Sequence, residues 1–360
     1  MEKVNFNKSF YKKILKNPEE TIKYFDLVYI NDSKLNIKRV RQGKSFLYEN
    51  DKNIIKDENI LNRIKSLVIP PAWEKVRVAS LDNGHLQAVG RDLKSRKQYR
   101  YHPKWNKIRN QTKFYKMHDF GLLLPKIRKK VNKDLAQKTW NKSKVLALVV
   151  KLLEETHIRI GNEQYAKRNK TYGLTTLRTK HLLKENNKLR FEFTGKRGKH
   201  HKITIRNKKL IRLINKCEEI PGWELFQFYD ESGIKQSVES SMINDYLHEI
   251  SGEFFTAKDF RTWSASLICF ETLRSFGVEK EEKQQKKNIL EAIDLAAKGL
   301  GNTRNVSRKY YIHPEIFNRY NDSSISKYFN FSTDDIKDNV QLSASEKSLL
   351  RLIKSYQPVI

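Results

Sequence analysis

The stretch LRFEFTGKRGKHHKITI, residues 189–205, has the pattern of a β-hairpin. Apolar and polar residues alternate over Leu189–Thr194 and again over His201–Ile205, which predicts two strands that each bury one face. The segment Gly195–Lys199 between them carries two glycines and places Lys196 at the tip of a basic turn. With a third strand predicted at Thr176–His181, the hairpin would form a small antiparallel sheet.

Helical patterns dominate the chain after about residue 107, because apolar residues recur there at helical spacing. The predicted helices are His118–Val131, Ser143–Thr156, Lys208–Cys217, Ser237–Ile250, Thr256–Phe276 and Lys283–Lys298. One small sheet among many helices predicts a mainly α-helical domain.

Residues 35–107 have a different pattern. Short alternating stretches such as Ile37–Arg41 and Leu86–Val89 predict strands, with turn signals at Asn83-Gly84 and at Gly90. One predicted helix, Asp57–Leu67, interrupts these strands and stops before Pro70-Pro71. Residues 1–30 predict short helices. This part of the chain is therefore expected to be β-rich.

The length of 360 residues predicts two domains, and the change of pattern places their boundary near residue 107. We expect a β-rich N-terminal domain with leading helices over 1–107 and a mainly helical domain over 108–325. The segment 326–360 is predicted to be a tail with a short helix at Ser345–Ser355. The predicted fold class is α+β.

Basic residues are in large excess and are concentrated in two blocks. Lysine and arginine number 72 against 41 acidic residues, a formal net charge of +31, which predicts a polyanionic partner. Arg91–Lys133 holds fifteen basic and two acidic residues, and Arg190–Lys216 holds ten and one. The first block also contains the aromatic residues Tyr99, Tyr101, Trp105, Phe114 and Tyr115. Rings among cations suit phosphates, sugars and bases, so we predict nucleic-acid binding.

Other classes of protein are excluded by the sequence. Cys217 and Cys269 cannot build a disulfide framework or a CxxC metal site, which indicates a reducing compartment. The longest apolar run, Val145–Val150, is far shorter than the ~20 residues that span a bilayer, and the first residues contain no secretory signal. Gly43-Lys44-Ser45 is not a P-loop, because the loop requires glycine where Lys38 stands. No residue cluster has metal-ligand spacing, so no metal site is predicted.

Four stretches offer groups for phosphodiester chemistry, which needs cations around the phosphorus and a side-chain nucleophile. In the first, Arg159 lies between two isoleucines. It could bind a phosphate, or it could form an ion pair with Glu154, Glu155 or Glu163. In the second, Lys196 could act as a catalytic amine or be an ordinary solvated residue of a hairpin tip.

The other two stretches are equally ambiguous when taken alone. Lys258 and Arg261 share one face of a predicted helix at i and i+3, where they could bind an anion or pair with Asp259 or Glu253. In Leu300–Pro314, basic residues precede two adjacent tyrosines, which could be a nucleophile segment or ordinary aromatic packing.

Taken together and in this order, the four stretches resemble the type IB DNA topoisomerases, in particular the compact poxvirus-like enzymes of bacteria. The resemblance runs from about Leu67 to Pro314. In the N-terminal part it is carried by Val68–Trp73 and Gly90–Tyr101. In the catalytic part it is carried by Ile158–Tyr165, Gly173–Leu177, Phe193–Lys196, Lys258–Trp263 and Leu300–Pro314. Four matches in order are far more specific than any one of them.

The resemblance implies a fold, an activity and a set of residues. The fold would be that of the tyrosine recombinases and type IB topoisomerases, with the N-terminal DNA-binding domain and the catalytic domain clamping DNA. The implied catalytic residues are Arg159, Lys196, Arg261, Asn302 and Tyr311. The implied DNA-binding residues are Lys258, Tyr99, Tyr101, Arg96, Lys97 and Tyr165.

The implied roles follow the chemistry of a phosphodiester exchange. Tyr311 would form a 3′-phosphotyrosyl link while both arginines and Asn302 stabilise the phosphorane. Lys196, supported by Lys258, would protonate the departing 5′-oxygen. Because one phosphodiester replaces another, neither ATP nor a metal cofactor is required. Swivelling of the nicked duplex would then release supercoils.

The nucleophile segment departs from the family pattern at one position and offers two tyrosines at another. Nuclear and poxviral relatives carry histidine where Asn302 stands; asparagine can donate a hydrogen bond to a phosphate but cannot change charge with pH. Tyr310 and Tyr311 are adjacent, and either could attack. The family register, directly before Ile-His-Pro, selects Tyr311.

Two other functions stay open. A tyrosine recombinase shares this chemistry, although such enzymes usually carry His-x-x-Arg where this chain has Lys258-x-x-Arg261, and they typically have a helical N-terminal domain. A non-catalytic DNA-binding protein would keep the basic groove without forming a covalent adduct. We expect a monomer that acts on double-stranded DNA in the cytoplasm, at the nucleoid, without membrane contact.

Overall fold

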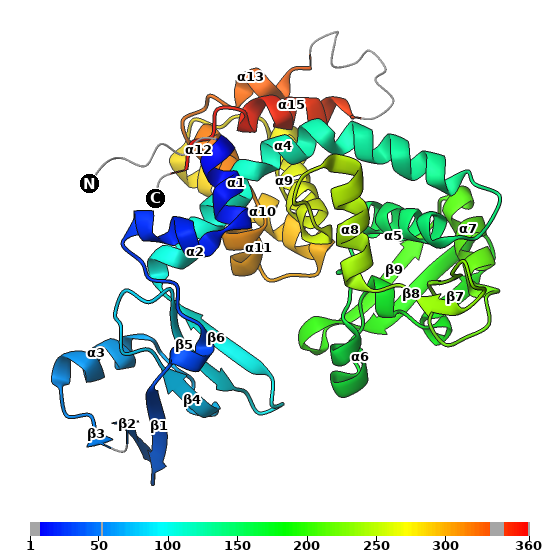
Figure 1. Cartoon of the computed structure of the whole chain (residues 1–360). Helices are drawn as coiled ribbons and strands as arrows, with labels where there is room; N and C mark the ends of the chain where they lie inside the picture. Colours follow the sequence, from blue (N-terminus) through cyan, green and yellow to red (C-terminus); the bar gives the residue numbers. More distant parts are fainter. Residues whose placement is uncertain (1–7, 52, 332–341, 359–360) are drawn as a thin grey trace. The chain divides into compact units, whose positions relative to one another are not determined.

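The computed structural model describes residues 8–51, 53–331 and 342–358. The chain divides into two compact units, Met1–Tyr115 with Gln357–Ile360, and Lys116–Tyr356. The helices and strands are labelled in Figure 1. Among the described residues, no helix combines the length and the apolar character that crossing a bilayer requires. The functional division into a DNA-binding domain, a catalytic domain and a tail stays a prediction.

The first unit is built on an antiparallel sheet with the strand order β3–β2–β1–β4–β5–β6. Its strands are β1 (Ile37–Gln42), β2 (Ser45–Asn50), β3 (Asn53–Ile54), β4 (Glu74–Val78), β5 (Leu86–Arg91) and β6 (Lys97–Tyr101). The short helices α1 (Lys8–Lys16) and α2 (Pro18–Thr21) precede the sheet. The predicted β-rich character of residues 35–107 is confirmed.

Helix α3 (Glu58–Ser66) is the one helix predicted within this β-rich part, and it forms as expected. The Asp57 carboxylate caps it by accepting hydrogen bonds from the backbone N–H groups of Asn59 and Ile60 at 2.8 and 3.2 Å. Its buried Ile64 packs with Val78 of β4. Burial of this apolar contact holds the helix on the sheet.

Gly90 lies inside β5, so the turn predicted there is wrong. A methyl group on this residue would lie 2.9 Å from Cε3 of Trp73 and 3.0 Å from Cγ2 of Val76. The glycine therefore serves the close packing of the indole against the strand rather than a reversal of the chain.

The second unit is mainly helical and contains a small three-stranded sheet and a separate two-stranded hairpin, which confirms the predicted α+β class. Its helices are α4 (Pro103–Leu135, which begins in the first unit), α5 (Lys142–Thr156), α6 (Glu163–Asn169), α7 (Lys208–Glu218), α8 (Ser240–Ser251), α9 (Ala257–Phe276), α10 (Glu282–Leu300), α11 (Arg304–Tyr310), α12 (Pro314–Asn321), α13 (Ser326–Phe329) and α15 (Ala344–Ile353). Helices α9 and α10 pack side by side (Figure 1). The apolar run Val145–Val150 is buried in α5, because α7, α8 and α9 all pack against this helix.

The small sheet has the strand order β7–β8–β9, with β7 (Leu182–Glu185), β8 (Lys188–Thr194) and β9 (His200–Ile205). The predicted hairpin is confirmed, and a second hairpin, β10 (Gln227–Tyr229) with β11 (Lys235–Ser237), follows α7. The strand predicted at Thr176–His181 is wrong. There the Thr176 hydroxyl and the His181 imidazole accept hydrogen bonds from the backbone N–H groups of Gly173 and Arg178, both at 3.0 Å. These local bonds favour short 3₁₀ turns over a strand.

Helix α15 confirms the helix predicted at Ser345–Ser355 and is anchored by a buried charge network. Glu346, 5% exposed, accepts hydrogen bonds from both terminal nitrogens of Arg128 on α4, at 2.7 and 2.9 Å. It also accepts one from Nε1 of Trp263 on α9 at 3.0 Å. Arg128 contacts Glu154 of α5 at 2.6 Å as well. The C-terminal helix is thus bound directly to α4 and α9, and Arg128 links this network to α5.

Glu346→Gln tests this network. Burial raises the pKa of Glu346, but the hydrogen bonds and charge of Arg128 outweigh burial and hold this pKa below its usual value. Such a carboxylate stabilises the fold above its unfolded pKa, and the stabilisation is lost as the pH falls through its folded pKa. We expect Glu346→Gln to lower the free energy of unfolding by about 1.5–3 kcal/mol at pH 7. The difference should shrink below about pH 4, as urea unfolding at both pH values would show.

Glu282→Gln is the matched control, because Glu282 pairs with Lys286 at 2.6 Å on the exposed surface of α10. This substitution should leave the stability almost unchanged. Equal losses in the two variants would contradict the importance assigned to the buried network.

Candidate active site

Arg159 lies in the loop between α5 and α6. Helix α5 ends at Thr156, and the left-handed backbone of the next residue, His157 (φ 54°), turns the chain. The carbonyl of Arg159 then accepts a hydrogen bond from the backbone N–H of Leu174 at 2.8 Å, which fixes the loop. From this position the Arg159 guanidinium donates to Oδ1 of Asn302.

Two of the three acids considered as ion-pair partners of Arg159 pair with other residues. Glu154 contacts Arg128 at 2.6 Å, and Glu163 contacts Lys167 at 3.4 Å. Among the ion pairs of the described residues, none joins Arg159 to Glu154, Glu155 or Glu163. Its guanidinium is instead directed at the loop that carries Asn302.

Arg261, on α9, is only 3% exposed. Its two terminal nitrogens donate to the carbonyls of His157 and Leu300, the second at 2.9 Å. These carbonyls lie at the C-terminal ends of α5 and α10, where the helix dipole favours a cation. The Nε–H of Arg261 is buried and meets no acceptor within the described part of the chain.

Lys196 follows Gly195 in the turn between β8 and β9. The turn is closed by a hydrogen bond of 2.7 Å from the N–H of Gly195 to the carbonyl of Lys199. Arg197 adopts the left-handed conformation (φ 65°) that lets the chain reverse. Lys196, Arg159 and Arg261 line one pocket with a volume of about 250 Å³. The structure therefore brings these three sequence-predicted residues together.

Asn302 follows Gly301, the residue in the left-handed conformation (φ 63°) that caps α10. A hydrogen bond of 2.8 Å from its backbone N–H to the carbonyl of Ala297 fixes Asn302 against the end of the helix. Its Oδ1 accepts from Arg159, while its buried Nδ2 has no acceptor among the described residues. A buried donor left in this way would be satisfied by an anion such as a phosphate.

Tyr311 stands at the end of α11, and α9 supports its backbone. The Ser266 hydroxyl of α9 donates to the carbonyl of Tyr311 at 3.3 Å and accepts from the N–H of His313 at 2.9 Å. The Arg261 guanidinium lies 5.4 Å from the centroid of the Tyr311 ring. Tyr310, by contrast, is 41% exposed. Of the two adjacent tyrosines, Tyr311 is the one packed against a site arginine.

Positive charge gathers around Tyr311 and shifts pKa values in one direction. Burial raises the pKa of Tyr311, but the charges of Arg261, Lys258 and Arg159 outweigh burial and hold this pKa below its usual value. Burial and the charge of Arg159 lower the pKa of the Lys196 ammonium. Burial also lowers the pKa of both arginines. A phenol that ionises more readily beside an ammonium that gives up its proton more readily suits nucleophilic attack with proton donation.

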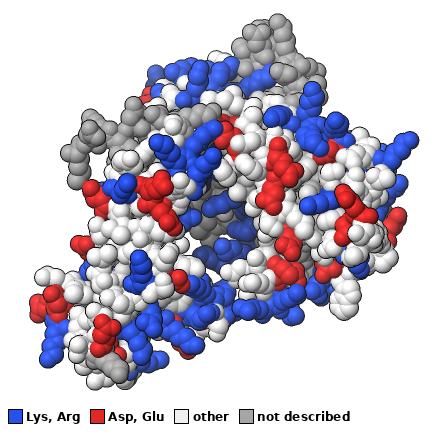
Figure 2. Space-filling view, viewed as in Figure 1, with Lys and Arg blue, Asp and Glu red and all other residues white. Residues whose placement is uncertain are grey.

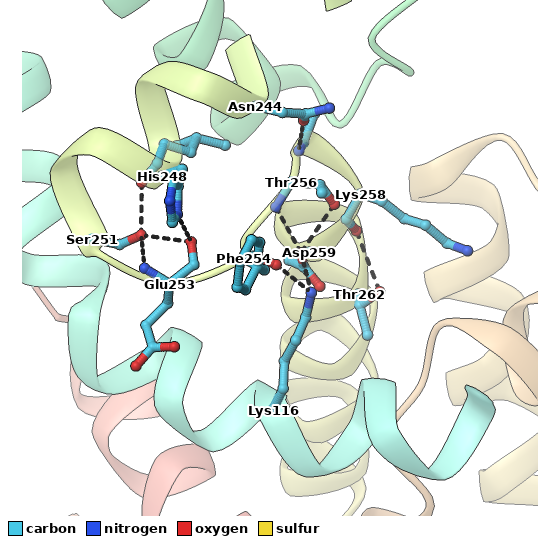
Figure 3. Close-up of polar contacts among 12 residues, drawn as sticks. Lys116, Asn244, His248, Ser251, Glu253, Phe254, Thr256, Lys258, Asp259 and Thr262 are labelled. Atoms are coloured by element: carbon cyan, nitrogen blue, oxygen red, sulfur yellow. Dashed lines mark hydrogen bonds and ion pairs between the residues drawn. The ribbon is translucent and has the colours of Figure 1, made fainter. Parts of the chain in front are cut away.

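Lys258 does not pair with Asp259, one of the two acids considered for it, and no ion pair of the described residues joins it to the other, Glu253. The Asp259 carboxylate instead accepts hydrogen bonds from Lys116 at 2.8 Å and from the N–H and hydroxyl of Thr256 at 2.8 and 3.0 Å (Figure 3). The side chain of Lys258 points away from this cluster (Figure 3). The buried acid thus fixes the first turn of α9, and the exposed Lys258 stays directed elsewhere.

The remaining predicted DNA-binding residues are divided between the two units of the chain. Tyr99 and Tyr101 stack on β6 with ring centroids 5.8 Å apart. Lys97 pairs with Asp32, and Arg96 contacts Asp92 at 2.6 Å. These residues belong to the first unit, whereas Tyr165, 45% exposed, belongs to α6 of the second. Lysine and arginine cover much of the surface in Figure 2, with acidic residues among them. Contact of these residues with DNA stays a prediction.

Sequence reasoning missed two features of the site. His201 lines the same pocket as Lys196. The sequence feature that could have indicated this is its position in the hairpin, where it pairs across the strands with Phe193. The Lys116–Asp259 pair was also missed. The spacing Thr256-x-x-Asp259 is a capping box that the sequence displays, but nothing in the sequence points to Lys116 as the partner.

Two family models match the chain. The model described as eukaryotic DNA topoisomerase I, catalytic core, matches residues 102–337. The model described as bacterial DNA topoisomerase IB, N-terminal domain, matches residues 45–92. Together they cover the four motif stretches and much of the β-rich unit.

Individual proteins show the same similarity. DNA topoisomerase 1B of Acanthamoeba polyphaga mimivirus is 34% identical over 338 residues, covering 89% of this chain and 95% of the viral protein. DNA topoisomerase 1 of rabbit fibroma virus (strain Kasza) is 28% identical, covering 78% and 88%. A solved structure of the XerH site-specific recombinase on DNA has a TM-score of 0.34 at 18% identity, covering 52% of this chain and 46% of that one. That likeness is too weak to bear on function.

Removing the charge of Lys258 should raise the pKa of Tyr311. Lys258 is among the charges that hold this pKa down, so Lys258→Ala weakens the preference for the phenolate. An NMR titration of ¹³Cζ-labelled tyrosine, with Tyr311→Phe to assign the signal, measures the shift. Lys283→Ala is the control, because Lys283 lies at the opposite end of α10 from Asn302. An unchanged Tyr311 signal in Lys258→Ala would contradict the electrostatic account.

Proposed function

The chain belongs to the type IB DNA topoisomerase family, and we propose that the cationic groups gathered around Tyr311 carry out its strand cleavage and rejoining. It is a DNA topoisomerase that relaxes supercoiled duplex DNA. The observation that carries the residue assignment is the Tyr311 phenol, whose pKa the surrounding cations hold below its usual value. A tyrosine in water ionises only near pH 10, so this environment favours attack at lower pH.

Tyr311 is the nucleophile of the proposed cleavage step. Its phenolate oxygen forms a bond to the phosphorus while the bond from phosphorus to the 5′-oxygen breaks. The Tyr311 proton passes to solvent, and Lys196 gives a proton to the departing 5′-oxygen. The products are a 3′-phosphotyrosyl link and a free 5′-hydroxyl. Rejoining is the reverse reaction, and since one phosphodiester replaces another, we propose that neither ATP nor a metal ion takes part.

Arg159, Arg261 and Asn302 stabilise the pentacoordinate phosphorus in this proposal. The Nε–H of Arg261 and Nδ2 of Asn302 are buried donors without an acceptor among the described residues, which supports binding of non-bridging oxygens. Arginine can place two parallel N–H groups on such oxygens. Because the donors are already held by the protein, they need little rearrangement during the reaction.

The partner of the enzyme is double-stranded DNA. We propose that the stacked Tyr99 and Tyr101, with Arg96 and Lys97, bind it through the first unit. Lys258 and Tyr165 contribute from the second unit. We further propose that the protein acts as a monomer on DNA of the cytoplasmic nucleoid. The recombinase alternative is disfavoured by the family membership and by the β-rich first unit.

Tyr311→Phe should abolish relaxation of a negatively supercoiled plasmid in EDTA without ATP, because phenylalanine has no attacking oxygen. Tyr310→Phe is the matched control and should retain relaxation and the covalent adduct seen after denaturation. Activity of Tyr311→Phe together with loss in Tyr310→Phe would move the nucleophile by one residue. Inactivity of the wild type in EDTA would overturn the metal-independent mechanism.

Lys196→Ala should slow single-turnover cleavage by roughly 10²- to 10⁴-fold, the contribution of a positioned general acid, while DNA binding stays nearly intact. A 5′-bridging phosphorothiolate should restore most of the rate. A thiolate leaves without a proton, since thiols ionise near pH 8.5, far below alcohols. Equal loss on both substrates, or a loss of binding as large as that of cleavage, would remove the general-acid role.

A further inference from the structure

His201 lies at the start of the second strand of the lysine hairpin, and one face of its ring is covered. It pairs across β8 and β9 with Phe193. The two rings stack with centroids 5.0 Å apart and planes inclined by 14°. The imidazole is therefore fixed on one side by an aromatic ring of the buried core.

The edge of the same imidazole lies against Gly195, the residue before Lys196. A methyl group on Gly195 would lie 2.7 Å from both Cδ2 and Nε2 of His201, closer than carbon atoms pack in proteins. The backbone of Gly195 has φ −96°, which any residue adopts. Glycine is thus required here by the histidine ring rather than by backbone conformation.

The imidazole also meets the loop that follows α10. A methyl group on Gly301 would lie 2.6 Å from Cε1 of His201. Gly301 directly precedes Asn302, and its position is fixed by the end of α10. His201 therefore fills the space between the lysine hairpin and a rigid helix end.

The ring fills this space without adding charge. Burial, followed by the charges of Arg159, Lys199, Arg261 and the neighbouring His200, lowers the pKa of His201 to about 4. At neutral pH the imidazole is uncharged. A cationic side chain in its place would add to the repulsion among the site's cations.

We propose that His201 is a positioning residue for Lys196, a neutral ring wedged between Phe193, the α10 end and Gly195 that fixes where the lysine turn stands. The inference rests on the proposed role of Lys196 as the proton donor. In this proposal His201 itself donates no proton to the substrate and acts only through the position of the lysine turn. Without the imidazole ring, the lysine turn would shift into the space that the ring occupied. The Lys196 ammonium would then no longer be in position to give a proton to the departing 5′-oxygen.

His201→Ala and the neighbouring control His200→Ala test the proposal in the full-length protein. Each is used in single-turnover cleavage of one duplex that carries either an ordinary 5′-oxygen or a 5′-bridging sulfur at the scissile phosphate. We expect His201→Ala to slow cleavage of the ordinary duplex by roughly 10- to 100-fold, the effect of misplacing a catalytic group by about 1 Å. Cleavage of the sulfur duplex should fall by less than about threefold, because a thiolate needs no proton donor. His200, exposed on the same strand, should give wild-type rates on both.

Equal losses on the two substrates, or no loss on the ordinary duplex, would overturn the positioning role. If His201→Ala does not fold, His201→Gln, which keeps part of the side-chain volume, is judged by the same ratio of rates. Lys196→Ala is measured beside them. Failure of the sulfur duplex to rescue Lys196→Ala would reject the proton-donor role itself, whereas rescue of Lys196→Ala alone would reject only the inference about His201.

A double-mutant cycle tests the contact directly. Gly195→Ala drives a methyl group into the imidazole and should slow cleavage of the ordinary duplex, again with rescue by sulfur. In the His201→Ala background the same substitution should cost little, because the space is free. Strictly additive losses in the cycle would show that the two residues do not act through each other and would overturn the proposal.

Discussion

The whole site depends on holding several positive charges close together around one pocket. Arg261 is 3% exposed, and Arg159 and Lys196 line the same pocket. Their mutual repulsion and loss of hydration both work against folding. The compensation visible in the structure is the pair of backbone carbonyls, at His157 and Leu300, that accept hydrogen bonds from Arg261.

Those two carbonyls explain the layout of the site. Helix α5 is followed by His157 and helix α10 by Gly301, and both of these capping residues adopt the left-handed conformation. Each turn exposes the last carbonyls of its helix to Arg261 and sends the chain back toward the site. As a result, Arg159 comes two residues after one turning residue and Asn302 directly after the other, and the two side chains meet. One way of ending a helix thus both stabilises a buried cation and delivers two further phosphate-binding groups.

Helix α9 supports several of the groups that make up the site. It carries Arg261, its Ser266 supports the backbone of the nucleophile segment, and its first turn is fixed by Asp259 and Lys116. Helix α9 also carries Trp263, whose indole N–H donates a hydrogen bond to Glu346 of α15. The C-terminal helix lies beyond residue 337, where the match to the family's catalytic core ends, yet it is packed into the core of this unit.

The sequence by itself determined the fold class, most helices, the lysine hairpin and the order of the motif stretches. Each of these features depends on local periodicity, turn residues or short spacings, which can be identified without the structure. Only the tertiary structure decided which partner each group has. Asp259 pairs with Lys116, 143 positions away, rather than with Lys258. Gly90 serves close packing against Trp73 rather than a turn of the chain, and Gly195, within the hairpin turn, leaves room for the ring of His201. No strand forms at Thr176–His181, because the side chains of Thr176 and His181 accept hydrogen bonds from nearby backbone N–H groups and favour short turns. The local sequence pattern reflects the conformation that a segment prefers. The burial and the partners of a side chain depend instead on which distant segments pack against it, and local spacing does not encode those contacts.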